Sequence, residues 1–135
     1  MLSRTLRIMV SIERAQEILD IYGKAWVEQD VELVLSIFSE DAEYWERAFV
    51  EPYIGHEMIG QYWQEKVVDE QSDIEFSLTN LLVSGDTIVA EWDASVTSNV
   101  QHKRIHLRSV AILETANGLV SRFREYWHSE KFDMS

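Results

Sequence analysis

The sequence predicts an α+β fold in which a cone-shaped, curved antiparallel sheet wraps around three helices and encloses a pocket. Two observations lead to this prediction. Helical periodicity dominates the first half of the chain, and the residues beyond 72 alternate as antiparallel strands. Helices that precede a strand meander do not build a parallel, doubly wound sheet. We therefore expect a four-strand meander, joined by a short N-terminal strand, to curve over the helices.

Three helical segments are expected in the first half. Apolar residues recur with i, i+3, i+4 and i+7 spacing over residues 11–29, and Ser11 is a suitable N-cap. A second, shorter helix follows Asp30, buries apolar residues as far as Phe38 and ends within residues 39–41. A short strand over residues 42–46 and a loop over 47–54 then lead to the third helix, which begins after Gly55.

The second half predicts four strands joined mostly by tight turns. The predicted ranges are 74–83, 87–97, 104–115 and 119–127. Residues 84–86, with Gly85 at their centre, join the first pair, and Asn117-Gly118 joins the last pair. Asn-Gly between two apolar runs is a strong hairpin pattern, so we expect consecutive strands to be neighbours.

Length and charge limit the classes of function. A chain of 135 residues is long enough for one domain, which we place at residues 9–130 after a flexible leader of residues 1–8. The net charge of −12 argues against a nucleic-acid partner. Basic residues gather in the last third, either as solvated ion pairs or as a cationic lining for an acidic small molecule.

Nothing in the sequence indicates a membrane or disulfide-rich protein. The apolar runs are much shorter than the roughly 20 residues of a membrane span. Arg7 interrupts the apolar N-terminal residues, so we do not expect a signal peptide. The chain has no cysteine, which fits a reducing compartment. We therefore expect a cytoplasmic protein without a membrane partner.

Three strings resemble the nuclear transport factor 2-like superfamily, in its small bacterial SnoaL-like and ketosteroid-isomerase-like branch. They are AWVEQDVELVLSIFSEDAEY, EPYIGHEMIGQYW and NGLVSRFREYW, and the resemblance covers residues 11–128. It implies a cone-shaped fold with a deep pocket, commonly dimeric through the outer face of the sheet. Members of that superfamily include isomerases, dehydratases, cyclases, epoxide hydrolases and non-enzymatic binders, so the fold does not settle the function.

The resemblance also assigns candidate catalytic positions. Ketosteroid isomerase uses an Asp base with a Tyr and a protonated Asp as oxyanion donors. By resemblance Tyr22 takes the tyrosine position and Glu46 the base position, whereas Val110 replaces the second acid. Phe38 and Trp63 replace two supporting tyrosines, so steroid isomerisation in that form is not expected. Tyr22 as a core residue and Glu46 as a solvated strand end remain open alternatives.

The alternation of the last two strands extends the candidate site. Matching Val110 to a pocket position places His106 and Arg108 inside the cavity as well. The same alternation places Phe123, Glu125 and Trp127 inside. An Arg108–Glu125 pair would either bind an acidic substrate group or form a structural ion pair, and both alternatives stay open. His106 is then the best candidate for proton transfer.

No metal or organic cofactor is expected. The chain has four histidines, and two of them, His102 and His106, are separated by about 13 Å on a strand. The HExxH pattern is absent, as are glycine-rich phosphate loops. Aromatic side chains from the first and third helices and the last strand, including Trp26 and Trp63, are expected to converge on a flat apolar ligand.

Three hypotheses follow. The first is a cofactor-independent acid–base enzyme (an isomerase, dehydratase or hydrolase) acting on an apolar or weakly acidic organic molecule. The second is a non-catalytic ligand-binding protein with the same pocket. The third is a homodimeric interaction domain that uses Leu107, Val120 and Tyr126 on the outer sheet face. The first assigns Glu46, Tyr22 and His106 to catalysis and the following residues to substrate binding: Trp26, Trp63, Arg108, Val110, Phe123, Glu125 and Trp127.

Overall fold

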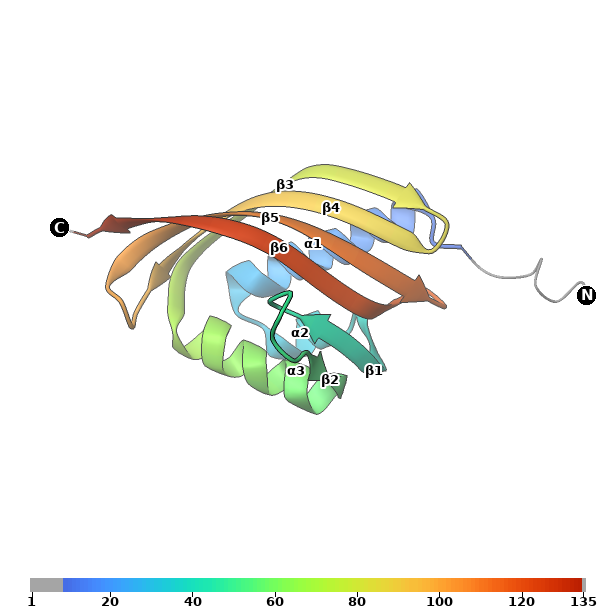
Figure 1. The fold of residues 1–135 in the computed structure, drawn as a ribbon, viewed down its shortest axis with the longest axis horizontal. Helices are drawn as coiled ribbons and strands as arrows, with labels where there is room; N and C mark the ends of the chain where they lie inside the picture. Colours follow the sequence, from blue (N-terminus) through green and yellow to red (C-terminus); the bar gives the residue numbers. More distant parts are fainter. Residues whose placement is uncertain (1–8, 135) are drawn as a thin grey trace, which may run out of the picture.

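The computed structural model describes residues 9–134 and confirms the α+β class. The predicted leader, residues 1–8, lies outside the described residues. In chain order the elements are α1 (Ile12–Glu28), α2 (Val31–Leu35), β1 (Phe38–Trp45), β2 (Tyr53–Ile54), α3 (Gly55–Trp63), the π-helical turn η2 (Gln64–Asp69), β3 (Gln71–Ser84), β4 (Thr87–Ser98), β5 (Lys103–Ala116) and β6 (Leu119–Asp133). The long strands curve over the helices, which all lie on one side of the sheet (Figure 1).

The sheet is mixed rather than purely antiparallel. It has six strands in the order β2-β1-β6-β5-β4-β3, and β1 runs parallel to β6. The prediction of an all-antiparallel sheet is therefore wrong for this one pair. A hairpin must be antiparallel, but β1 and β6 are separated by most of the chain, so no turn fixes their relative direction. The additional strand β2 lies in the predicted loop and pairs with β1.

Local capping explains where the first helices begin and end. Ser11 accepts a hydrogen bond from the backbone N–H of Arg14 at 3.0 Å, as an N-cap does. The second helix is shorter than predicted, because it ends at Leu35 and β1 already begins at Phe38. The backbone N–H of Val120 donates to the carbonyl of Ile37 at 2.8 Å. This bond to the start of β6 draws the buried residues after α2 into the sheet instead of the helix.

Both predicted hairpins are present, and the strands are longer than predicted. Asn117 and Gly118 have positive φ angles of 53° and 77°, which the short β5–β6 turn requires. The β3–β4 turn uses Gly85 with a φ of 61°. The predicted polar connection over residues 69–73 is largely the end of η2 and the start of β3, and β6 continues to Asp133.

The core lies between the concave face of the sheet and the helices. Along β4 the even-numbered residues from Ile88 to Val96 are buried, while the odd-numbered residues up to Ser95 are only half-buried. Aromatic rings fill the centre of the core. Phe123 stacks on Tyr44 with ring centroids 4.6 Å apart and on Tyr22 at 5.3 Å. These two pairs connect the last strand to β1 and α1.

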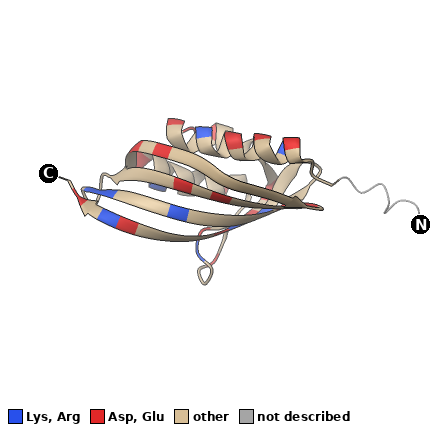
Figure 2. Ribbon diagram, turned by 90° about the horizontal axis from the view of Figure 1, so that it is seen from above, with Lys and Arg blue, Asp and Glu red and all other residues tan. Residues whose placement is uncertain are grey.

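Acidic and basic residues are interspersed over the surface. Acidic positions lie along α1 and on the strands, and basic positions lie among the acidic ones (Figure 2). Among residues 9–134, no helix is long and apolar enough to span a bilayer.

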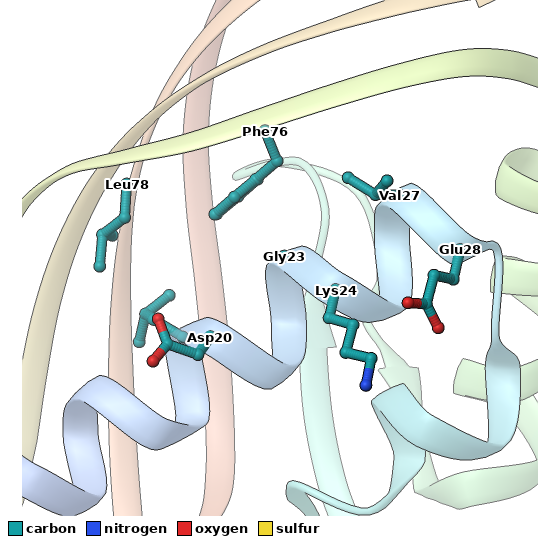
Figure 3. A pocket seen from close by; sticks show the side chains of 8 residues that line it. Asp20, Gly23, Lys24, Val27, Glu28, Phe76 and Leu78 are labelled. Atoms are coloured by element: carbon teal, nitrogen blue, oxygen red, sulfur yellow. The ribbon is translucent and has the colours of Figure 1, made fainter.

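A groove of about 370 Å³ lies between α1 and the edge strand β3, and Gly23 is one of the residues that line it. The ring of Phe76 lies against the helix at this glycine (Figure 3). A Cβ atom at position 23 would lie 2.4 Å from Cδ1 of Phe76, well inside van der Waals contact. The absence of a side chain at Gly23 therefore lets β3 approach the helix.

We expect Gly23→Ala to destabilise the protein by about 1–2 kcal/mol, because the cost of overpacking exceeds the helix propensity gained. Gly60→Ala is the matched control in α3. Its Cβ would make an ordinary contact, 3.4 Å from Cδ1 of Leu35, so it should stabilise by roughly 0.5–1 kcal/mol. Urea unfolding of the three proteins measures both effects. A Gly23→Ala protein as stable as wild type would contradict this account of the groove.

Candidate functional site

A cavity of about 480 Å³ opens between the concave face of the sheet and the α3–η2 segment. Its inner end is lined by two carboxylates, Glu46 at the end of β1 and Glu125 on β6, together with Tyr53 and Tyr62. Its middle is lined by apolar side chains of β4 and β5 and by Trp26 and Trp127, and the outer end by polar residues. The inner end therefore combines acid–base groups with a cavity whose walls are partly apolar and partly polar.

The parallel pairing of β1 with β6 brings the two carboxylates together. Tyr44 is paired with Phe123, and Trp45 with Arg124. The next step in the same register leads to Glu46 and Glu125, which alternate onto the concave face with Tyr44 and Phe123. Two residues separated by most of the sequence thus become neighbours through strand pairing.

Two tyrosine hydroxyls connect Glu125 to the core. The Tyr44 hydroxyl donates to Oε2 of Glu125 at 3.4 Å, and the Tyr22 and Tyr44 hydroxyls lie 3.3 Å apart. A hydroxyl has a single proton to donate. Because Tyr44 directs its proton to Glu125, Tyr22 is the donor to Tyr44. The result is a short relay that points from the core toward the Glu125 carboxyl.

The environment of Glu125 favours its neutral form. Burial of the carboxyl, together with the smaller effect of the negative charge of Glu46, raises the pKa of Glu125 from 4.5 to about 8. The hydrogen bond from Tyr44 and the positive charge of Arg47 oppose this shift without reversing it. Glu125 keeps some accessible surface because it lines the cavity. At neutral pH it is therefore a protonated acid that faces the cavity.

The neighbouring tyrosines stay protonated as well. Burial raises the pKa values of Tyr22, Tyr44 and Tyr62 well above their usual range, and the charge of Glu125 raises them further. Both Glu125 and Glu46 act on Tyr62, which lines the cavity. The Tyr62 hydroxyl is thus a neutral donor within electrostatic reach of both carboxyls.

Glu46, the residue directly after β1, is held by contacts with its neighbour Arg47 and with Trp127 of β6. Nε of Arg47 lies 3.2 Å from Oε1 of Glu46, whose side chain is 20% exposed. Nε1 of Trp127 donates to the backbone carbonyl of Glu46 at 3.1 Å. The guanidinium of Arg47 also lies over the Trp127 ring, 4.8 Å from its centroid. Trp127 therefore fixes the segment that positions the second carboxylate.

The predicted orientation of three β5 residues is wrong. His106, Arg108 and Val110 lie on the outer face of the sheet, and the cavity is lined instead by Ile105, Leu107 and Ser109. A shift of one residue moves every side chain of a strand to the opposite face. The resemblance placed Val110 one residue away from the position that faces inward.

Outer-face partners confirm this correction. Nε of Arg108 lies 3.1 Å from Asp93 rather than beside Glu125, so the predicted Arg108–Glu125 pair does not form. Nδ1 of His106 lies 3.3 Å from Glu130, and its ring has no access to the cavity. Within residues 9–134, no three His, Asp or Glu side chains gather in a group that could hold a metal ion.

Some of the other predicted site residues line the cavity, and the rest lie in the hydrophobic core. Trp26 and Trp127 line the cavity, and Nε1 of Trp26 donates to Oε1 of Gln71 at 2.8 Å. Trp63 and Phe123 are 1% and 0% exposed and lie in the core, behind the cavity wall. Tyr22 is also buried and reaches the site only through Tyr44.

The predicted outer patch also needs correction. Leu107 lines the cavity, and Val120 is fully buried, so neither contributes to an exposed surface. Tyr126, at 45% exposed, is on the outer face as predicted. Beside it Val110, its partner across the β5–β6 ladder, is 37% exposed.

Sequence reasoning missed the participation of Tyr44, Tyr62 and Arg47. Tyr44 and Glu46 are two residues apart, which on a strand predicts a common face. That spacing was the available clue for Tyr44. No sequence pattern showed that β6 would lie beside β1, and Tyr62 had the periodicity of an ordinary core residue.

We expect the raised pKa of Glu125 to weaken folding as the pH rises. The folded protein keeps this proton where the unfolded chain has lost it, so stability falls between pH 4.5 and about 8. In Glu125→Gln this fall should be smaller by roughly 2–4 kcal/mol. Urea unfolding of both proteins across that range measures the difference. Identical pH dependence of the two proteins would show that Glu125 titrates normally.

Solved structures of low sequence identity share the fold. A ketosteroid isomerase-like protein from Catenulispora acidiphila, in complex with trimethylamine, has a TM-score of 0.74 and 16% identity, over 82% of this chain and 84% of its own. An epoxide hydrolase from M. tuberculosis has a TM-score of 0.72 and 14% identity, over 86% and 84%. A putative isomerase from Bacillus subtilis has 0.74 and 20%, over 89% and 90%.

Sequence comparison identifies the family. None of the curated proteins matches the chain significantly. The model of the SnoaL-like domain matches residues 19–123, which is most of the chain and includes α2, α3 and strands β1 to β5. The chain therefore belongs to the family of SnoaL-like domains.

Proposed function

We propose that the protein is a cofactor-independent acid–base enzyme that acts on a small, largely apolar organic molecule. One observation supports this most strongly: Glu125, whose pKa is raised by burial, and a second carboxyl, Glu46, line the same end of a cavity that also has apolar walls. Two nearby carboxyls with different environments are a common arrangement for paired acid and base roles. The proposed reaction class is isomerisation, dehydration or hydrolysis.

In this proposal Glu125 is the general acid and Glu46 the general base. Glu46 removes a proton from a substrate carbon or from an attacking water, while Glu125 delivers its proton to a substrate oxygen. Arg47 pairs with Glu46 and limits the charge that the cavity must hold. The proton leaves Glu125 as negative charge develops on its carboxyl, where Tyr44 already donates a hydrogen bond.

The remaining residues position the groups and the substrate. Tyr22 supports Tyr44 from the core and is not in contact with the cavity. Tyr62 is a second neutral donor for a substrate oxygen. Trp26 and Trp127 supply apolar wall area for the substrate. The epoxide hydrolase and the putative isomerase with this fold favour acid–base chemistry on an organic oxygen as the class to test.

The experiment uses a panel of epoxides, β,γ-unsaturated ketones and β-hydroxy ketones. Once a substrate is found, Glu125→Gln and Glu46→Gln should each reduce kcat by about 10²–10⁴-fold. Glu65→Gln is the control, because Glu65 is an exposed carboxylate of η2 that does not line the cavity. Activity should also fall as the pH rises through about 8, where Glu125 loses its proton. Full activity of Glu125→Gln would exclude the proposed acid.

A non-catalytic binding protein is the second candidate. The observation that favours it is the aromatic packing behind the carboxyls, where Phe38 and Trp63 provide no hydroxyl to extend the Tyr22–Tyr44 relay. The two functions are distinguished by incubating a bound panel compound with the protein and analysing it by mass spectrometry and chiral chromatography. A ligand recovered unchanged, with Glu46→Gln and Glu125→Gln binding as wild type does, supports the binder.

We further propose a homodimer through the outer face of the sheet. Val110 and Tyr126 are adjacent and partly exposed there, and an apolar strip flanked by ion pairs such as Arg108–Asp93 suits a symmetric contact. Light scattering should give the mass of two chains for wild type and of one chain for Val110→Glu. Met58→Glu, which changes an exposed residue of α3, should remain dimeric. A wild-type mass of one chain would contradict the proposal.

A further inference from the structure

The cavity is elongated along β6. Glu125, Trp127, Ser129 and Lys131 all line it, as alternate residues of one strand do. At about 3.3 Å per residue, Lys131 lies roughly 20 Å along the strand from Glu125. The cavity therefore has two distinct ends, one with the paired carboxyls and the other with a lysine.

The section between the two ends is lined mainly by apolar side chains, with Ser109 and Ser129 among them. Ile105 is paired with Lys131 across the β5–β6 ladder, and Leu107 with Ser129, so their side chains lie beside the same stretch of β6. Val96 of β4 lies next to Ile105 and is almost completely buried. Trp26 adds an aromatic wall from α1. A ligand that spans the cavity must have an apolar middle to match this lining.

Lys131 differs from the other cations near the cavity. Arg47 is paired with Glu46 at 3.2 Å, and Lys66 with Glu70 at 3.5 Å. Lys103, two ladder positions away on β5, is paired with Asp133 at 2.7 Å. Over residues 9–134, no carboxylate is paired with Lys131, which is exposed at the cavity mouth. Its ammonium group is free to bind an anion from outside.

The charged side chains at the two ends of the cavity also determine the orientation in which an anionic ligand binds. An anionic group at the inner end would approach Glu46. The cation at that end, Arg47, is already paired with Glu46. The same group at the outer end meets Lys131. Because only the outer end offers an unpaired cation, a single orientation of an anionic ligand is favoured.

We propose that the substrate is an elongated amphiphile with an anionic terminus, and that Lys131 binds this terminus. The oxygen-bearing reactive group then lies at Glu125, about 20 Å along the strand. The chemical class is a long-chain organic acid that carries an epoxide, hydroxyl or carbonyl far from its carboxylate. This substrate class rests on the proposed function, but the role of Lys131 in binding is tested separately from catalysis.

The test measures binding of dodecanoate and dodecanol by isothermal titration calorimetry, below the micelle concentration of either probe. The two differ only in their polar terminus. Wild type should bind dodecanoate about three- to fivefold more tightly than dodecanol. Lys131→Met should abolish this preference, and Lys131→Glu should reverse it. Lys24→Met, which changes an exposed lysine of the α1–β3 groove, should retain it.

The proposal is overturned if wild type binds neither probe, if it does not prefer dodecanoate, or if Lys131→Met keeps the preference. Failure of the proposed function looks different. Glu125→Gln should lose turnover yet keep the preference for dodecanoate, since its change lies at the other end. Normal turnover in Glu125→Gln would remove the acid–base mechanism and leave the Lys131 result unaffected.

Discussion

The parallel pairing of β1 with β6 is the constraint on which the site depends. It places the end of β1 beside the middle of the last strand, so that Glu46 approaches Glu125 and Tyr44 stacks on Phe123. No turn enforces this pairing. It depends on the buried apolar residues at the start of β1, such as Phe38, and on the bond between Ile37 and Val120. Local packing at the start of β1 therefore determines the chemistry at its end.

The same packing holds the Glu125 carboxyl in a buried position, where its ionised form is unfavourable. A buried carboxyl costs free energy, which the protein limits by keeping Glu125 neutral and by directing the Tyr22–Tyr44 relay toward it. The stacked rings of Tyr22, Phe123 and Tyr44 exclude water behind the carboxyl. They also fix the hydroxyls, whose rotation in a looser core would break the relay. The free-energy cost of burying Glu125 is thus offset by the neighbouring aromatic packing of Tyr22, Tyr44 and Phe123.

Much of the fold could be predicted because its determinants are local. The cap at Ser11 and the Asn117-Gly118 turn are encoded within a few residues, and both were found in the sequence. The site was less predictable because it depends on which face of each strand is buried. On β5 one set of alternate residues, which includes Leu107, is mainly apolar, and the other includes His106 and Arg108. The resemblance selected the second set, and hydrophobicity alone would have selected the first.

The position of Lys131 also explains how an acidic protein can attract an anion. The net charge of −12 repels anions at long range, but salt screens that repulsion beyond about 8–10 Å. Within this distance the electrostatic potential at a cation depends on whether a carboxylate is already paired with it. Arg47 and Lys66 are already neutralised by Glu46 and Glu70, so neither draws an anion strongly. The electrostatic potential is therefore most favourable for a carboxylate at the unpaired ammonium of Lys131, and the inner end offers the carboxylate no unpaired cation.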